Sequence, residues 1–260
     1  MPTVDFEAYL NEEYDGGKPF DIATLLQMED EAGIDVAVVM PANAQAGTRQ
    51  TYLQPDNQRV ADAIRGNRRC IGCATINPTL GDENTQRQLA IMRDNGFGGA
   101  KLMAVLHKYN IDDPVVDPVM AALRESGLVA SIHSGPDNVH PNRIGNVAKR
   151  FPEVPIIMDH MGYPDATEDA IRVAEECPNV YLGTTILRFF KPPEAAYPTA
   201  VAEAVRRVGP ERVVWGSNLP EYRHSALWCR QAIERLKLGA EAEALIFGAN
   251  LTRLYKITGW

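Results

Sequence analysis

The chain has 260 residues, of which 45% are hydrophobic and 23% charged, and its formal net charge is −8 at pH 7. A chain of this length and composition can bury one large core, so we expect a single domain over residues 1–260. The acidic balance, without a long basic run, argues against a nucleic-acid partner, and no apolar run is long enough to indicate a membrane partner.

Short apolar runs alternate with amphipathic runs from end to end, which is typical of parallel strands joined by crossover helices. The expected strands are residues 3–10, 34–40, 70–77, 99–103, 128–133, 156–160, 180–184 and 213–217. The expected helices are residues 22–31, 57–64, 83–94, 116–125, 143–150, 168–176, 195–208 and 241–255, with an additional helix at 225–237. This pattern predicts a (β/α)8 TIM barrel. An open doubly wound sheet is the alternative, but no Gly-x-Gly-x-x-Gly opens the first helix.

Glycines mark several of the expected helix ends. Gly33, Gly96, Gly127 and Gly209 each follow a helical run, and glycine tolerates the left-handed turn that closes a helix. These positions support the number and order of the elements better than they support any single boundary.

The four cysteines, at positions 70, 73, 177 and 229, are few and scattered. This usage suits a reducing compartment, and the start of the chain lacks the pattern of an export signal, so we expect a cytoplasmic protein. Cys70 and Cys73 form a C-x-x-C in an apolar run. Because strand positions three apart point to opposite faces, we expect core cysteines rather than a redox or zinc pair.

Three polar side chains stand where apolar strands end. His133 closes Ser-Ile-His, His160 closes Met-Asp-His, and Asn218 follows Trp-Gly-Ser. In a barrel the carboxyl ends of the strands converge on one mouth, where the chemistry takes place. Imidazole is a common metal ligand and an acid–base group near neutral pH, so we expect a site here. Since adjacent strand residues face opposite ways, Asp159 is not assumed to orient His160.

The first strand adds two further candidates. Glu7 and Tyr9 are two residues apart and therefore lie on one face of the strand. A carboxylate in an apolar strand is costly unless a cation or hydrogen-bond donors compensate for it, so Glu7 is a candidate ligand. For Tyr9 three roles stay open: a metal-bound phenolate, a proton donor to a developing oxyanion, or a side chain that fills the mouth.

Two positively charged side chains are further candidates for the site. Lys101, in Gly-Ala-Lys-Leu, can neutralise a substrate carboxylate, polarise a carbonyl or form a buried pair with Glu7, and the pair would compete with a metal for Glu7. Arg143, in the loop after His133, is a candidate clamp for an acidic substrate, although most loop arginines are solvated.

In this order, these motifs and the closing run Ala-Leu-Ile-Phe-Gly-Ala-Asn-Leu resemble the amidohydrolase superfamily, in the branch of decarboxylases and lactonases. The resemblance covers the full chain. It implies a (β/α)8 barrel with one or two divalent metals at the mouth, which activate water for hydrolysis or a bound acid for decarboxylation.

The departures from the family pattern concern the metal ligands. Where the family usually has His-x-His on the first strand, this chain has Glu7 and Tyr9, and Asn218 stands where an aspartate is usual. Only His133 and His160 keep their identities. The five residues still form an oxygen and nitrogen ligand set, which suits iron, manganese or zinc. Losing the aspartate removes the usual base, so His160 or a metal-bound hydroxide would replace it.

The leading hypothesis is therefore a hydrolase of an ester, lactone or thioester. In it a metal lowers the pKa of water, His160 moves protons, and Tyr9, Lys101 or Asn218 stabilises the oxyanion. The second hypothesis is a nonoxidative decarboxylase of an aromatic or unsaturated acid, from Glu7, Lys101 and Arg143. The third is a metal-free or noncatalytic binding protein on the same scaffold, from Tyr9 and Asn218.

The expected partner is a small acyl or carboxylic acid substrate, and the question of self-association into a homo-oligomer stays open. Loops at residues 42–55 and 186–198 are candidate pocket walls. The second loop is rich in large apolar residues, and Phe189 is the expected substrate contact, although packing on the barrel rim explains such residues equally well.

Overall fold

The computed structural model describes the whole chain except residues 12–17, 43–52, 186–196 and 221–224. Within it, eight parallel strands lie side by side in chain order. They are β1 (Val4–Leu10), β2 (Val36–Pro41), β3 (Cys70–Thr75), β4 (Gly99–Leu102), β5 (Val129–His133), β6 (Ile156–Asp159), β7 (Val180–Gly183) and β8 (Val213–Val214). All eight predicted strands are confirmed; seven of them lie within the predicted ranges, and β2 begins two residues later and ends one residue later than predicted.

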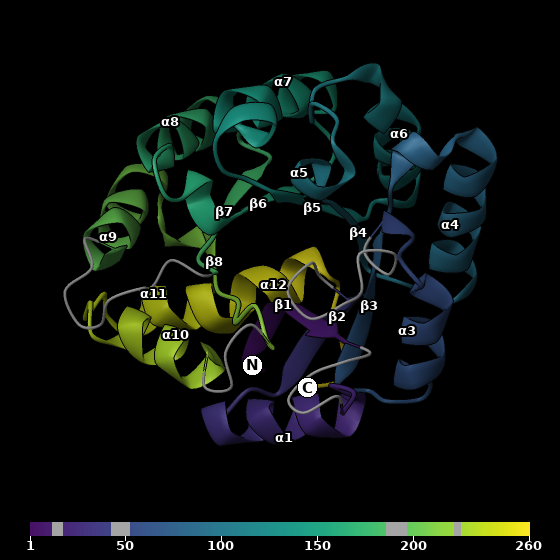
Figure 1. Cartoon of the computed structure of the whole chain (residues 1–260). Helices are drawn as coiled ribbons and strands as arrows, with labels where there is room; N and C mark the ends of the chain where they lie inside the picture. The colour runs from purple at the N-terminus through teal and green to yellow at the C-terminus, as the bar shows by residue number, and fades with distance from the viewer. Residues whose placement is uncertain (12–17, 43–52, 186–196, 221–224) are drawn as a thin grey trace.

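Helices follow the strands and form a ring around them (Figure 1). The main ones are α1 (Ile22–Ala32), α3 (Asn57–Ile64), α4 (Asp82–Asp94), α6 (Asp117–Ser126), α7 (Pro141–Arg150), α8 (Thr167–Glu176), α9 (Tyr197–Val208) and α10 (Ser225–Glu234). The closing run comprises α11 (Ala240–Ala244), a π-helical turn η7 (Leu245–Ala249) and α12 (Asn250–Leu254), and a short α5 (Ala104–His107) follows β4. Within the described chain, no helix is both long and apolar enough to cross a bilayer.

Hydrogen bonds between β1 and the segment after β8 bring the two ends of the sheet together. The backbone nitrogen of Tyr9 donates to the carbonyl of Leu219 at 2.8 Å, and that of Asn218 donates to the carbonyl of Glu7 at 2.9 Å. Ala8 and Leu219 form a parallel bridge. The predicted (β/α)8 barrel is therefore confirmed.

Two apolar cores stabilise the barrel. The larger core lies between the strands and the surrounding helices and includes Leu25, Ile132 and Trp215. The smaller one includes Phe6 and Cys73 and fills the inside of the barrel. Cys73 belongs to the inner core while Cys70 packs against the outer one, and both are free thiols. The two cysteines therefore face opposite ways, as predicted.

Local signals fix several helix ends. Asp21 accepts a hydrogen bond from the backbone of Thr24 at the start of α1, which satisfies one of the donors that a helix start leaves open. Gly33 and Gly127 close α1 and α6 in the left-handed conformation, with φ of 69° and 60°. The glycine pattern in the sequence marked both ends.

Candidate active site

An irregularity in β1 places the first-strand candidates. The pairing of β1 with β2 shifts between Asp5 and Ala8, so Phe6 and Tyr9 both belong to the inner core although they are three positions apart. The Tyr9 hydroxyl donates to Oε1 of Glu7, and both side chains are buried. The predicted common face of Glu7 and Tyr9 is therefore present, and Tyr9 serves Glu7 as a hydrogen-bond donor.

A buried lysine joins two carboxylates inside the barrel. Nζ of Lys101, on β4, lies 2.6 Å from Oε1 of Glu7 and also donates to Oδ2 of Asp159 at the end of β6. All three side chains have 0% exposure. Oδ1 of Asp159 accepts from the hydroxyl of Ser131, on β5, at 2.9 Å. Of the readings open for Lys101, the structure contains the buried pair, extended to a second carboxylate.

Next to this cluster, two imidazoles contact each other. Nε2 of His160 lies 3.1 Å from Nδ1 of His133, with the rings edge to face. Nδ1 of His160 lies 2.6 Å from the hydroxyl of Thr185. His160 is buried, whereas His133 is partly exposed at the end of β5. His133 is thus the member of the pair that a ligand can reach.

A left-handed turn brings both Asp159 and His160 to the site. His160 has a φ of 60° and Met161 a φ of 47°, a conformation uncommon for residues other than glycine. The chain therefore leaves the strand at His160, and the alternation of strand side chains does not extend to it. Ser134 holds this turn, because its hydroxyl accepts from the backbone nitrogen of Gly162 at 2.7 Å and donates to the carbonyl of Asp159.

The electrostatics follow from burial and charge. Burial alone raises the pKa of Glu7, but the charge of Lys101 and the hydrogen bonds from Lys101 and Tyr9 outweigh it and lower the pKa to about 2. Glu7 is therefore a carboxylate at neutral pH. Burial lowers the pKa of His133 well below its usual range, and the neighbouring His160 and Lys101 add to this. His133 is therefore a neutral imidazole, the form that accepts a proton.

Behind the site, a second buried carboxylate ties β1 to the segment after β8. Oδ1 of Asp5 accepts from the backbone nitrogens of Glu7 at 3.0 Å and Ser217 at 2.8 Å. Glu29 of α1 is buried against Asp5, and burial raises the pKa of Asp5 to about 6 and that of Glu29 well above its usual range. The charge of Asp5 adds to the shift at Glu29, as does Asp30, while Arg69 opposes it.

The remaining predicted site residues are Asn218, Arg143 and Phe189. Asn218 is buried with a φ of 57° and donates from its backbone to Glu7. Arg143, on α7, pairs with Asp112 at 2.7 Å. Among the described residues, no hydrogen bond or ion pair joins Arg143 to another predicted site residue. Phe189 lies outside the described residues, as do most of the two loops expected to form the pocket walls.

Sequence reasoning missed Asp159 as a member of the site, together with the hydroxyls of Ser131, Ser134 and Thr185. The signal for Asp159 was present, since a carboxylate stood in an apolar strand as Glu7 did. Strict alternation of strand side chains, however, points Asp159 away from His160, so the pattern alone does not predict it in the site. Short hydroxyl side chains are too common at strand ends to stand out.

The cluster offers ligand atoms of the type that divalent metals bind. Glu7, Asp159 and His160 each present one such atom within 4.8 Å of the others, and Oε2 of Glu7 has no hydrogen-bond partner among the described residues. However, Lys101 already donates to both carboxylates. A metal that bound the same two oxygens, Oε1 of Glu7 and Oδ2 of Asp159, would need the space of the lysine's ammonium group. The residues as arranged do not fit the expected metal.

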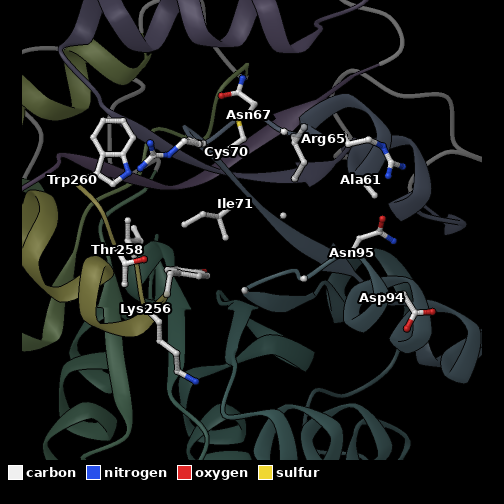
Figure 2. Close-up of a pocket in the computed structure, with 18 residues that line it drawn as sticks. Ala61, Arg65, Asn67, Cys70, Ile71, Asp94, Asn95, Lys256, Thr258 and Trp260 are labelled. Atoms are coloured by element: carbon white, nitrogen blue, oxygen red, sulfur yellow. The ribbon is translucent and has the colours of Figure 1, made fainter.

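A large cavity lies at the opposite end of the barrel. It has a volume of about 640 Å³ and is lined by Cys70 and Ile71 at the start of β3, by Asn95 after α4, and by Lys256 and Trp260 near the end of the chain (Figure 2). The candidate site residues stand at the carboxyl ends of the strands, so this cavity is separate from them.

Comparison with known proteins identifies the family of this chain. A sequence model of the amidohydrolases matches residues 9–257. An L-fucono-1,5-lactonase of Burkholderia ambifaria is 29% identical over 190 residues, which are 65% of this chain and 64% of that protein. The match thus spans slightly less than two thirds of this relative.

Solved structures with the same fold cover nearly the whole chain. A candidate 2-pyrone-4,6-dicarboxylic acid hydrolase from Pseudomonas putida superposes with a TM-score of 0.76 at 17% identity, over 100% of this chain and 99% of that one. An amidohydrolase from Burkholderia multivorans that contains bound zinc superposes with a TM-score of 0.74 at 13% identity, over 99% and 100%. At these identities the likeness concerns the fold.

Proposed function

Because this chain belongs to the amidohydrolase family of enzymes, we propose that it hydrolyses an activated acyl bond, with a lactone of a small carboxylic or sugar acid as the substrate class. The observation that carries this proposal is the imidazole pair at the barrel mouth, with a partly exposed, neutral His133 backed by a buried His160. The similarity to a fucono-lactonase supports the choice of a lactone.

The hydrogen bonds of the pair define a base. When Thr185 accepts from Nδ1 of His160, Nε2 of His160 accepts from Nδ1 of His133. The lone pair of His133 is then on Nε2, from which it can take a proton from water. His160 positions this ring and fixes its tautomer. The proton-transfer role expected of His160 is thus assigned to His133.

The buried cluster of Glu7, Lys101 and Asp159 supplies the electrostatic part of the proposed catalysis. The carboxylate of Glu7 favours the positive charge that His133 gains when it takes a proton, while Lys101 is fully buried and donates to Glu7 and Asp159. Tyr9 donates its proton to Glu7, so we assign it the task of holding Glu7 rather than that of a phenolate ligand. Asn218 stays a candidate donor to the oxyanion.

The reaction proceeds in two steps. In the first, the oxygen of a water molecule bonds to the lactone carbonyl carbon while His133 takes the water proton, and the carbonyl oxygen becomes an oxyanion. In the second, the oxyanion collapses, the ring carbon–oxygen bond breaks, and His133 returns the proton to the leaving alkoxide. The product is a hydroxy acid, and a lactone is less demanding than an amide because its leaving group is better.

This proposal is tested with lactones, esters and thioesters of small acids, and with aromatic and unsaturated carboxylic acids assayed for carbon dioxide release. We expect lactone hydrolysis with a kcat that falls by about 100-fold or more in His133→Ala, from the loss of a general base. His140→Ala is the matched control, because His140 caps α7 and faces Asp169 at 3.6 Å, and its loss should leave kcat unchanged.

Two results would contradict the proposal. Turnover of no acyl substrate would exclude the hydrolase, and carbon dioxide release that depends on His133 would replace it by the decarboxylase. The iron, manganese or zinc expected from the ligand types enters no step of this mechanism. Self-association and a location in the cytoplasm stay predictions.

A further inference from the structure

We propose that the ammonium group of Lys101 is the resident cation of this site, in the place of a divalent metal, and that the native enzyme holds Glu7 and Asp159 together without a metal ion. The proposal does not depend on the reaction assigned above. It rests on which atoms are already bonded to one another inside the barrel.

The first argument is one of space. Zinc binds carboxylate oxygens at about 2.0–2.2 Å, and Nζ of Lys101 lies 2.6 Å from Oε1 of Glu7 while it also donates to Oδ2 of Asp159. These are two of the three side chains that bring potential ligand atoms within 4.8 Å of one another, the third being His160. A metal that bound the same two oxygens, Oε1 of Glu7 and Oδ2 of Asp159, would have to displace the ammonium group, whose side chain is fully buried.

The second argument is one of charge. Glu7 and Asp159 carry two negative charges and Lys101 one positive charge, so the three together carry one negative charge beside two imidazoles. A buried ammonium group is stable only when it is paired, and here it has two partners. Without Lys101, two carboxylates and two imidazoles would remain, which is an oxygen and nitrogen donor set that suits zinc.

The third argument concerns the other expected ligands. Tyr9 acts as a hydrogen-bond donor to Glu7 rather than as a phenolate, and Asn218 is a neutral amide in place of a charged ligand. Of the five predicted ligands, only Glu7 carries a negative charge that attracts a cation, and Lys101 neutralises it. A covalently attached cation supplies the positive charge and cannot dissociate.

The test compares metal binding in three forms of the full chain. After purification with and without a chelator, metal content is measured by elemental analysis, and thermal unfolding is followed with added zinc, added manganese or chelator. For the wild type we expect metal well below one equivalent per chain and a melting temperature that neither metal nor chelator changes.

Two variants distinguish the effect of the charge of Lys101 from the effect of its volume. Lys101→Ala opens the space between the carboxylates, so we expect it to gain zinc binding, with a melting temperature that rises with zinc concentration. Lys101→Met removes the charge but fills the space, so it should be less stable than the wild type and gain much less from zinc. If Lys101→Ala folds only with zinc, the proposal is supported equally.

A stoichiometric metal in the wild type, lost from Glu7→Gln, would overturn the proposal, as would a wild-type melting temperature that falls on chelation. These wild-type measurements decide the question even if both lysine variants fail to fold. None of them requires a substrate, so failure of the hydrolase proposal and failure of this one remain distinguishable.

Discussion

Replacing Asp159 by asparagine tests the buried ion pair on which this account depends. The carboxylate accepts from Lys101 through one oxygen and from Ser131 through the other, at 2.9 Å, with no exposure to solvent. Breaking a buried pair by removing one partner costs about 3–5 kcal/mol. Because Lys101 keeps Glu7 at 2.6 Å, we expect the lower end, about 3 kcal/mol for Asp159→Asn.

The matched control is Ser131→Ala, which removes the other hydrogen bond to the same carboxylate and leaves every charge in place. A hydrogen bond to a charged group contributes about 1.5–3 kcal/mol, so this variant should be more stable than Asp159→Asn. Both free energies of unfolding come from denaturant titration at neutral pH with a chelator present, which removes any contribution of bound metal. If Asp159→Asn is as stable as the wild type, or no less stable than Ser131→Ala, the reasoning about the ion pair is refuted.

Three further predictions concern the surroundings of the site. Burial beside Asp5 raises the folded-state pKa of Glu29 above its unfolded value, so it contributes stability at acid pH that is lost as the pH rises. The melting temperature of the wild type, relative to that of Glu29→Gln, should therefore be lower at about pH 8 than at about pH 5, and a difference that does not change with pH would contradict the shift. A Cβ on Gly183 would lie 2.6 Å from the ring of Phe6, so Gly183→Ala should cost about 1–3 kcal/mol in a denaturant titration. Adding Phe6→Leu should recover part of that loss, and no recovery would argue against the contact. Ser134→Ala removes two hydrogen bonds at the turn of β6 and should cost about 1–3 kcal/mol, whereas unchanged thermal unfolding would show that the turn does not need them.

The elements could be predicted because their signals are local. The run at residues 57–64 is bounded by Asp56, which caps the helix start, and the observed helix has the same limits. The closing run at 241–255 was predicted as one helix, and it contains a π-helical turn at Leu245–Ala249. Apolar periodicity does not distinguish such a turn from a continuous α-helix.

The site was predictable where spacing along one strand decides the geometry. The common face of Glu7 and Tyr9 follows from a separation of two residues, and the pairing of Lys101 with Glu7 was one of three readings of a lysine at a strand end. Asp159 was set aside because alternation was extended one residue too far. The left-handed backbone of His160 breaks that alternation, and no residue type in the sequence predicts this conformation.

Long-range pairing marks the limit of sequence reasoning in this chain. Arg143 was a candidate clamp for an acidic substrate, whereas in the structure it pairs with Asp112, 31 residues away along the chain. Nothing in the local pattern distinguishes a loop arginine that binds a ligand from one that pairs across the surface. The roles of Arg143 and of Phe189 in substrate binding stay predictions.

The most direct test of the central claim is a crystal structure of the enzyme grown with zinc or manganese, with anomalous scattering recorded at the absorption edge of the metal. We predict no anomalous peak within bonding distance of Glu7 or His160, and electron density for the ammonium group of Lys101 between the carboxylates of Glu7 and Asp159. An anomalous peak bound by Glu7 and His160, with Lys101 turned away, would contradict the account.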